Sequence, residues 1–98
     1  MITNFKERHK VPKPKYKNGD YILLDEKEEH GWTVYLSAKI LNVLPYYDQV
    51  CYKLLTIIKK TGKELILRSV VEDAIDRKLT SKEIEEFEII IDASKYNL

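Results

Sequence analysis

The stretch Lys17–Asp25, KNGDYILLD, decides the fold because a polar turn opens directly into a short apolar run. Glycine adopts a positive φ without steric cost, and the side chains of Asn18 and Asp20 can hydrogen-bond their local backbone, so residues 18–20 have the chemistry of a tight turn. The apolar run Tyr21–Leu24 that follows predicts a first strand. We therefore expect the chain to change here from an irregular N-terminal segment into a sheet.

A polar, acid-rich connection follows at residues 25–31 and ends in glycine, as in a long hairpin loop. Residues Trp32–Leu44 then alternate with a period of two and have one clearly apolar face, which predicts a long second strand. Pro45 ends this strand because proline cannot donate a hydrogen bond to a central ladder.

The next segments predict two further strands and a short helical turn. Val50–Lys59 is rich in residues that favour strands, and a tight turn at residues 60–63 separates it from a fourth strand at Glu64–Arg68. Residues 69–71 either extend the fourth strand or form a short fifth one. Residues 72–75 predict a single helical turn.

The last element is predicted to be a helix that runs from about Ser81 to Asp92. Thr80 and Glu83 fit a capping box, in which each side chain accepts a hydrogen bond from the backbone of the other residue. Three apolar residues recur at helical spacing and predict the face that packs on the sheet: Ile84, Phe87 and Ile91.

The charge is distributed unevenly along the 98 residues. The formal net charge is +1, but residues 1–17 hold six basic residues against Glu7 alone, so this segment is +5 and the remainder is −4. Two prolines among lysines in Val11–Lys15 predict an extended arm. We divide the chain into an arm at residues 1–16, a sheet domain at residues 17–79, and a helix with its tail at residues 80–98. Two interpretations of the arm stay open: it binds phosphate, anionic lipid or an acidic protein face, or it is a solvated terminus.

The composition places the chain among soluble intracellular proteins. The single cysteine, Cys51, allows no intrachain disulfide. No apolar run reaches the roughly 18 residues of a membrane span, and the N-terminus has no apolar segment of the signal-peptide type. We expect a cytoplasmic protein.

The order of strands, loops and helical turn over residues 17–76 resembles the SH3-like small barrels, with the Tudor, chromo-barrel and KOW groups as the nearest in layout. Gly19–Asp20 before the first strand and Ala38–Ile40 in the second stand as similar pieces do in that family. The resemblance implies a mainly β fold, a five-stranded barrel with a C-terminal helix. It also implies binding of methylated peptides, nucleic acid, or polymerase and ribosomal partners. Residues 75–88 look similar to the C-terminal end of small uncharacterised barrel proteins of phages and large DNA viruses, which implies a virus-encoded protein.

The sequence offers no positioned catalytic group, and we expect no enzyme activity, cofactor or metal. His9 falls in the arm and His30 in a loop, so neither is a positioned base. Cys51 falls inside a strand, where a cysteine is typically a small buried hydrophobe. The carboxylates of the first loop either bind a cation or a basic peptide or are simply solvated: Asp25, Glu26, Glu28 and Glu29.

Nucleic-acid binding is the most concrete functional hypothesis, because basic residues neutralise phosphates and exposed aromatic rings stack on bases. The candidate residues are Lys6, Arg8, Lys10, Lys13, Lys15, Lys17, Tyr46 and Tyr47. The alternative is a protein-interaction module that reads a peptide or self-associates, with its site at Trp32, Tyr35, Glu26, Glu28 and Glu29. The expected partners are therefore nucleic acid, an acidic protein surface or a second copy of the chain, with neither a membrane nor a small-molecule substrate.

Overall fold

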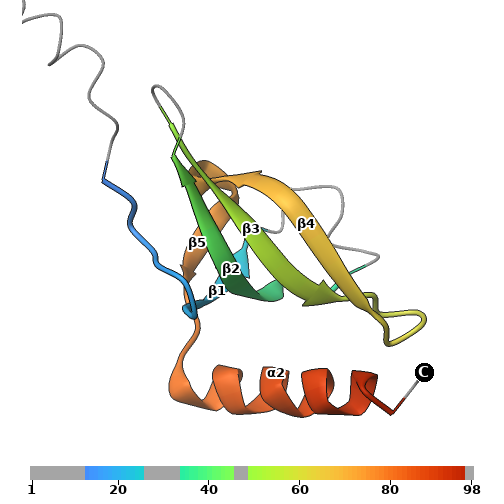
Figure 1. Ribbon diagram of the computed structural model, residues 1–98. Helices are drawn as coiled ribbons and strands as arrows, with labels where there is room; N and C mark the ends of the chain where they lie inside the picture. The colour runs from blue at the N-terminus through green and yellow to red at the C-terminus, as the bar shows by residue number, and fades with distance from the viewer. Residues whose placement is uncertain (1–12, 26–33, 46–48, 97–98) are drawn as a thin grey trace, which may run out of the picture.

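The computed structural model describes residues 13–25, 34–45 and 49–96, which form one open antiparallel sheet and a C-terminal helix (Figure 1). The strands lie side by side in the order β4-β3-β2-β1-β5. Their bounds are β1 Tyr21–Leu24, β2 Ser37–Pro45, β3 Val50–Ile57, β4 Glu64–Val71 and β5 Ile75–Lys78, and the helix is α2 Ser81–Ser94. The prediction of a mainly β fold with a C-terminal helix is confirmed. Within the described part of the chain, β4 and β5 are the two edges of the sheet.

The turn before β1 has the predicted conformation and is tied to β2. Gly19 has a φ of +90°, and the backbone N–H of Asp20 donates to the carbonyl of Lys17 at 3.0 Å. The Asp20 carboxylate accepts from the N–H of Lys17 at 3.0 Å. Two further backbone bonds of 2.8 Å join Gly19 and Asp20 to Ile40. The turn therefore sets the position of β1 beside β2.

The second strand begins at Ser37, later than the predicted start at Trp32, which lies outside the described residues. Val34 forms only an isolated bridge with Ile58. The hydroxyl of the fully buried Thr56 lies 3.0 Å from the carbonyl oxygen of Tyr35 and 2.9 Å from that of Ser37. One side chain thus contacts two carbonyls of the incoming segment, and the regular ladder starts only after this point.

After β4 the chain forms one element that the sequence predicted and one that it did not. Residues 69–71 extend β4, and Glu72–Ala74 form one turn of 3-10 helix, η2, where a helical turn was predicted. The strand β5 that follows pairs with β1. Its sequence, IDRK, has a single apolar residue, Ile75, so it lacks the alternation that predicts a strand. Backbone pairing with β1 forms this strand.

The helix α2 begins as predicted and ends two residues later than Asp92. Glu83 N–H donates to the hydroxyl oxygen of Thr80 at 3.3 Å, and Thr80 N–H donates to the Glu83 carboxylate at 2.8 Å, which confirms the capping box. Phe87 is buried, and Ile84 and Ile91 are partly buried beside it, so the predicted apolar stripe faces the sheet.

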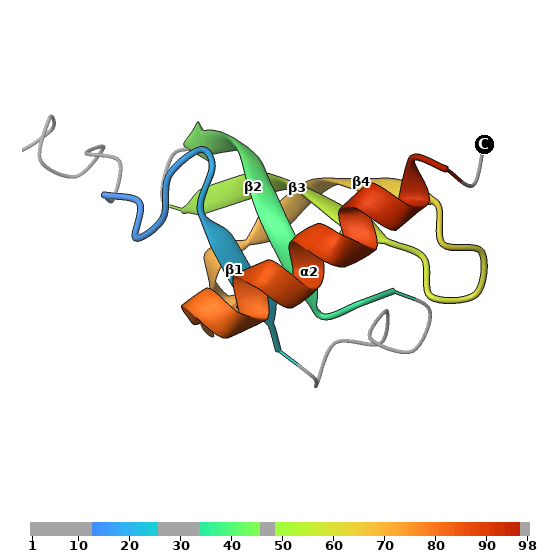
Figure 2. The ribbon, with the colours of Figure 1, turned by 90° about the horizontal axis from the view of Figure 1, so that it is seen from below.

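The sheet is buried on both faces at β1, and this explains why two separate cores form. Ile22 and Leu24 point into a first core inside the curved sheet, together with Tyr52. Tyr21 and Leu23, which alternate with them, point toward a second core under α2, centred on Ile57, Leu79 and Phe87. Figure 2, seen from below, shows α2 crossing the sheet on this second side.

The start of α2 predicts a specific acid sensitivity. The Arg77 guanidinium, at 2.7 and 2.9 Å, and the Thr80 N–H lower the pKa of Glu83 from 4.5 to about 2. A carboxylate with a depressed pKa stabilises the fold above pH 4.5, and this contribution is lost as the pH falls toward 2. Urea unfolding of the protein and of Glu83→Gln is expected to show a stability difference at pH 7 that narrows between pH 4.5 and pH 2. Glu86→Gln, on an exposed site of the same helix, serves as the control, and an equal narrowing there would contradict the assignment.

Candidate ligand-binding surface

A shallow depression lies on the side of the sheet that α2 packs against, beyond the part that the helix covers. It is lined by Leu41, Lys53, Ile66 and Arg68, which we call the basic patch. Lys53 and Arg68 are exposed, and Ile66 is 41% exposed although it lies in a strand. The patch thus combines two cationic side chains with two apolar ones on an open sheet face.

Two β-bulges shape the basic patch. In β2 the register shifts between Ile40 and Asn42, so Leu41 is an extra residue opposite Lys53. In β4 the register shifts beside Lys53 again, and residues 68–69 together lie opposite it. A bulge increases the local twist and redirects side chains. The two bulges place extra side chains from both neighbouring strands around Lys53.

The strands around the patch, together with the turn between β3 and β4, carry most of the positive charge of the described sheet. Residues 34–45 and 49–71 contain six basic residues against Glu64 alone, and residues 72–96 contain eight acidic residues against four basic ones. None of the described residues that line the depression carries a carboxylate. Among the residues that the structure describes, neither Lys53 nor Arg68 has an ion-pair partner, whereas Arg77 pairs with Glu83 and Lys78 with Asp20. The charges of Lys53 and Arg68 are therefore available to an anionic ligand.

The groove between α2 and the sheet differs from the basic patch because its own charges are matched. Glu88 and Asp92 of the helix face Lys39 of β2 across this groove. The Lys39 ammonium lies 5.6 Å from the centre of the Tyr21 ring, and the Tyr21 hydroxyl donates to Glu88 at 3.3 Å. Burial and the Glu88 carboxylate raise the pKa of Tyr21. Two basic and two acidic side chains line this groove, so its charges balance: Lys39, Lys95, Glu88 and Asp92.

The described end of the arm is fixed to the body by Tyr16. Its ring meets the ring of Tyr52 edge-on at 5.8 Å, and its N–H donates to the Tyr52 hydroxyl at 3.4 Å. The Tyr52 hydroxyl donates in turn to Glu72 at 2.6 Å, and Glu72 also accepts from the N–H of Lys15 at 3.1 Å. Burial, followed by this bond to Glu72, raises the pKa of Tyr52, and burial also raises the pKa of Tyr16. The arm therefore leaves the body from a defined point.

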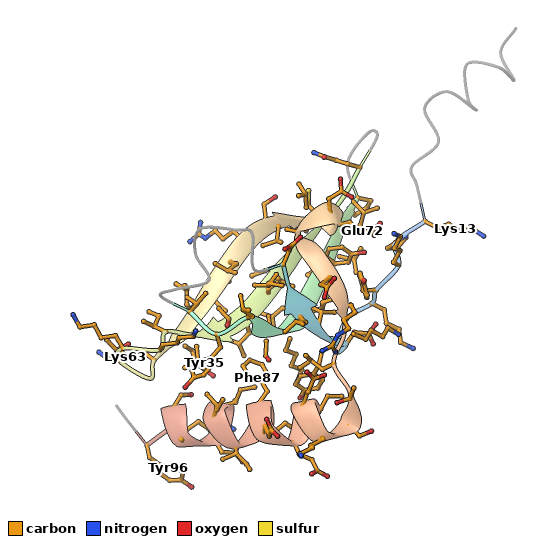
Figure 3. All side chains as sticks on the ribbon, turned by 180° about the vertical axis from the view of Figure 1, so that it is seen from behind. Lys13, Tyr35, Lys63, Glu72, Phe87 and Tyr96 are labelled. Atoms are coloured by element: carbon orange, nitrogen blue, oxygen red, sulfur yellow. The ribbon has the colours of Figure 1, made fainter. Side chains whose placement is uncertain are left out.

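The predicted nucleic-acid residues fall partly within the structure. Lys13, Lys15 and Lys17 are exposed on the described end of the arm. Figure 3 shows Lys13 and Glu72 at the same end of the molecule. The other candidates lie outside the described residues: Lys6, Arg8, Lys10, Tyr46 and Tyr47.

Of the predicted peptide-binding residues, only Tyr35 is described; Trp32, Glu26, Glu28 and Glu29 lie outside the described ranges. Tyr35 is half-buried against the second core, and the Lys59 ammonium lies 5.7 Å from its ring centre. In Figure 3 Tyr35 lies near Lys63, far from Lys13. The structure does not bring Tyr35 and the described arm cations together.

Sequence reasoning missed the basic patch. Lys53 stands between the buried residues Tyr52 and Leu54, so period-two alternation alone places it on the outer face of β3. The same alternation in β4 places Ile66 and Arg68 on one face. The bulges, which have no signal in the sequence, gather these side chains with Leu41.

Neither a metal cluster nor a membrane-spanning helix is found in the described ranges. No group of three or more His, Cys, Asp or Glu side chains there could hold a metal ion, and Cys51 is buried. No helix in these ranges is long and apolar enough to cross a membrane. Comparisons of the chain with protein-family models, curated proteins and solved structures found no match.

Proposed function

We propose that this chain is a non-enzymatic binding module of the SH3-like barrel class that binds a nucleic-acid strand through the basic patch and the arm. The observation that carries the proposal is the pair of exposed cations, Lys53 and Arg68, that lack a carboxylate partner in the described structure and flank a depression lined by Leu41 and Ile66. Cations on an open sheet face neutralise phosphates. Apolar side chains beside them contact sugars and bases of a strand whose bases are accessible.

The arm adds a second group of cations to the proposed interface. Lys13, Lys15 and Lys17 follow one another on the described end of the arm, and Tyr16 anchors that segment to the first core. A ligand bound by both the arm and the patch gains affinity from each, and that affinity depends strongly on salt. The acidic residues of α2 repel phosphate, which directs the strand toward β2–β4 and away from the helix.

The test is a titration of a labelled oligothymidylate, followed by fluorescence anisotropy at several salt concentrations. The double variant Lys53→Glu/Arg68→Glu is expected to bind about tenfold more weakly or worse, because two side chains that attract phosphate become repulsive. The slope of log affinity against log salt is expected to fall by about 0.7 for each phosphate that the variant no longer neutralises. Removal of residues 1–12, which takes away the other three candidate cations Lys6, Arg8 and Lys10, is expected to weaken binding further.

The matched control is Lys82→Glu/Lys95→Glu, which changes the net charge equally but at two exposed residues away from the patch, one in α2 and one directly after its end. It is expected to bind much more tightly than the patch variant. Equal losses of affinity in the two double variants would show that net charge alone attracts the oligonucleotide. Absence of binding by the unmodified protein at low salt would refute the proposal, and selective capture of an acidic peptide over the oligonucleotide would replace it with the protein-interaction alternative.

A further inference from the structure

The strand β4 forms an edge of the sheet and carries a charge pattern that is complementary to itself. It is eight residues long and pairs with β3 on one side only within the described structure. An edge strand of this length offers a row of backbone donors and acceptors to another strand.

The direction of these backbone groups follows from the ladder. The N–H of Ile58 donates to the carbonyl of Lys63 at 2.8 Å, so this pair is of the hydrogen-bonded kind. Hydrogen-bonded and non-hydrogen-bonded pairs alternate in an antiparallel ladder. The pairs that contain Glu64 and Ile66 are then of the non-hydrogen-bonded kind. The N–H and C=O groups of these two residues therefore point away from β3, toward the open edge.

The side chains on the outer face of β4 place an acidic, an apolar and a basic residue at equal spacing. These residues are Glu64, Ile66 and Arg68. Ile66 is 41% exposed, and neither charged residue has an ion-pair partner among the described residues. When such a pattern is rotated by 180° about its centre, each charge meets its opposite.

We propose that two copies of this chain associate through their β4 edges, antiparallel, with Ile66 on the two-fold axis. Ile66 then lies opposite Ile66 of the second copy, and Glu64 lies opposite Arg68 of the second copy. On the other face, Leu65 lies opposite Leu67 of the second copy. Directly opposite residues in an antiparallel pair are the closest side chains across the strands, so opposite charges there stabilise the register and like charges destabilise it.

The neighbouring registers are less favourable. A shift by two residues places Glu64 or Arg68 opposite Ile66 of the second copy, so the charged pairs no longer form. A shift by one residue places backbone groups that point toward β3 opposite the outward groups of the second copy. The charge pattern and the hydrogen-bonding pattern thus select the same register, and the resulting sheet has both basic patches on one face.

The experiment measures the oligomeric state, without nucleic acid, by light scattering during size-exclusion chromatography over a concentration series. The unmodified protein is expected to form a dimer with a dissociation constant in the micromolar range, because a single strand pair is a small interface. Glu64→Arg and Arg68→Glu each place like charges opposite one another. Each is expected to raise the dissociation constant by about tenfold or more.

The decisive variants are combinations of these two changes. The charge-swapped double variant Glu64→Arg/Arg68→Glu restores both opposite pairs and is expected to dimerise again. An equimolar mixture of the two single variants is expected to form the mixed dimer, which native mass spectrometry distinguishes by mass. Glu86→Arg on α2 is the matched control for Glu64→Arg and is expected to dimerise like the unmodified protein.

Three results would overturn the proposal: a monomer at every concentration, single variants that still dimerise, or a double variant that stays monomeric while its circular dichroism shows the folded sheet. Because nucleic acid is absent, such a result leaves the proposed nucleic-acid binding standing. Arg68 belongs to both the basic patch and the β4 edge, so the single variant Lys53→Glu separates the two proposals: it is expected to bind oligonucleotide more weakly and to dimerise like the unmodified protein.

Discussion

Replacing Phe87 with alanine is expected to lower the free energy of unfolding by about 3–5 kcal/mol. Phe87 is 1% exposed and lies between α2 and the sheet, where it packs in the second core with Ile57 and Leu79. Its ring also meets the ring of Tyr21 edge-on at 6.2 Å. Truncation removes apolar contacts and leaves a cavity that the surrounding strands can fill only in part. Because small domains have about 5–15 kcal/mol of total stability, the variant is expected to lie near the limit of folding.

The measurement is urea unfolding followed by circular dichroism, and the matched control is Ile89→Ala on the same helix. Ile89 is 68% exposed, and alanine favours helix more than isoleucine does, so this change is expected to alter stability by about 0.5 kcal/mol or less. Similar losses of stability in both variants would mean that α2 contributes through its helicity and not through docking at Phe87.

The parts of the fold that the sequence predicts best are those that local chemistry determines. Gly19 and Asp20 form a turn because of their own backbone and side-chain preferences. Thr80 and Glu83 form a capping box because their spacing alone brings each side chain to the other's N–H. These two features do not depend on distant residues, so the local sequence is enough to predict them.

The parts that the sequence does not predict depend on distant partners. β5 exists because β1 offers it a backbone ladder, although its own residues are mostly charged. The start of β2 lies at a contact with the next strand, where the Thr56 hydroxyl meets the carbonyl oxygens of Tyr35 and Ser37. The hydroxyl of the buried Tyr52 also finds its hydrogen-bond partners in Tyr16 and Glu72, which are distant in sequence. The alternation of apolar and polar residues and the strand propensities contain no information on which distant residues pair.

The basic patch also depends on residues that are distant in sequence. The net charge of residues 18–98 suggests a mildly acidic body, but this average combines a basic group of strands with an acidic C-terminal part. The sheet order brings β2, β3 and β4 together, whereas the separate element α2 carries a group of five acidic residues: Glu83, Glu85, Glu86, Glu88 and Asp92. A sum over the sequence cannot show this separation, because it depends on which strands are neighbours. A mildly acidic total therefore does not argue against a basic binding face.

Replacing Tyr52 with phenylalanine is expected to lower the free energy of unfolding by about 1–3 kcal/mol. Tyr52 is fully buried, and its hydroxyl is the link between Glu72 and the N–H of Tyr16. Phenylalanine keeps the ring contact with Tyr16 but leaves the carboxylate and the N–H without this partner. Amide hydrogen exchange at Tyr16 is therefore expected to accelerate in the variant, because the root of the arm is no longer held.

The pH dependence of this stability difference tests whether the phenol group of Tyr52 causes it. Burial and the Glu72 carboxylate raise the pKa of Tyr52 above its ordinary value of 10.0. A phenol with a raised pKa stabilises the fold below pH 10, and this contribution is lost as the pH rises above that value. The stability difference between the protein and Tyr52→Phe is thus expected to be constant from pH 7 to pH 9 and to shrink above about pH 10. Tyr96→Phe, at a side chain that is 87% exposed, is expected to match the unmodified protein throughout. A difference that does not change with pH would show that the hydroxyl acts through packing alone.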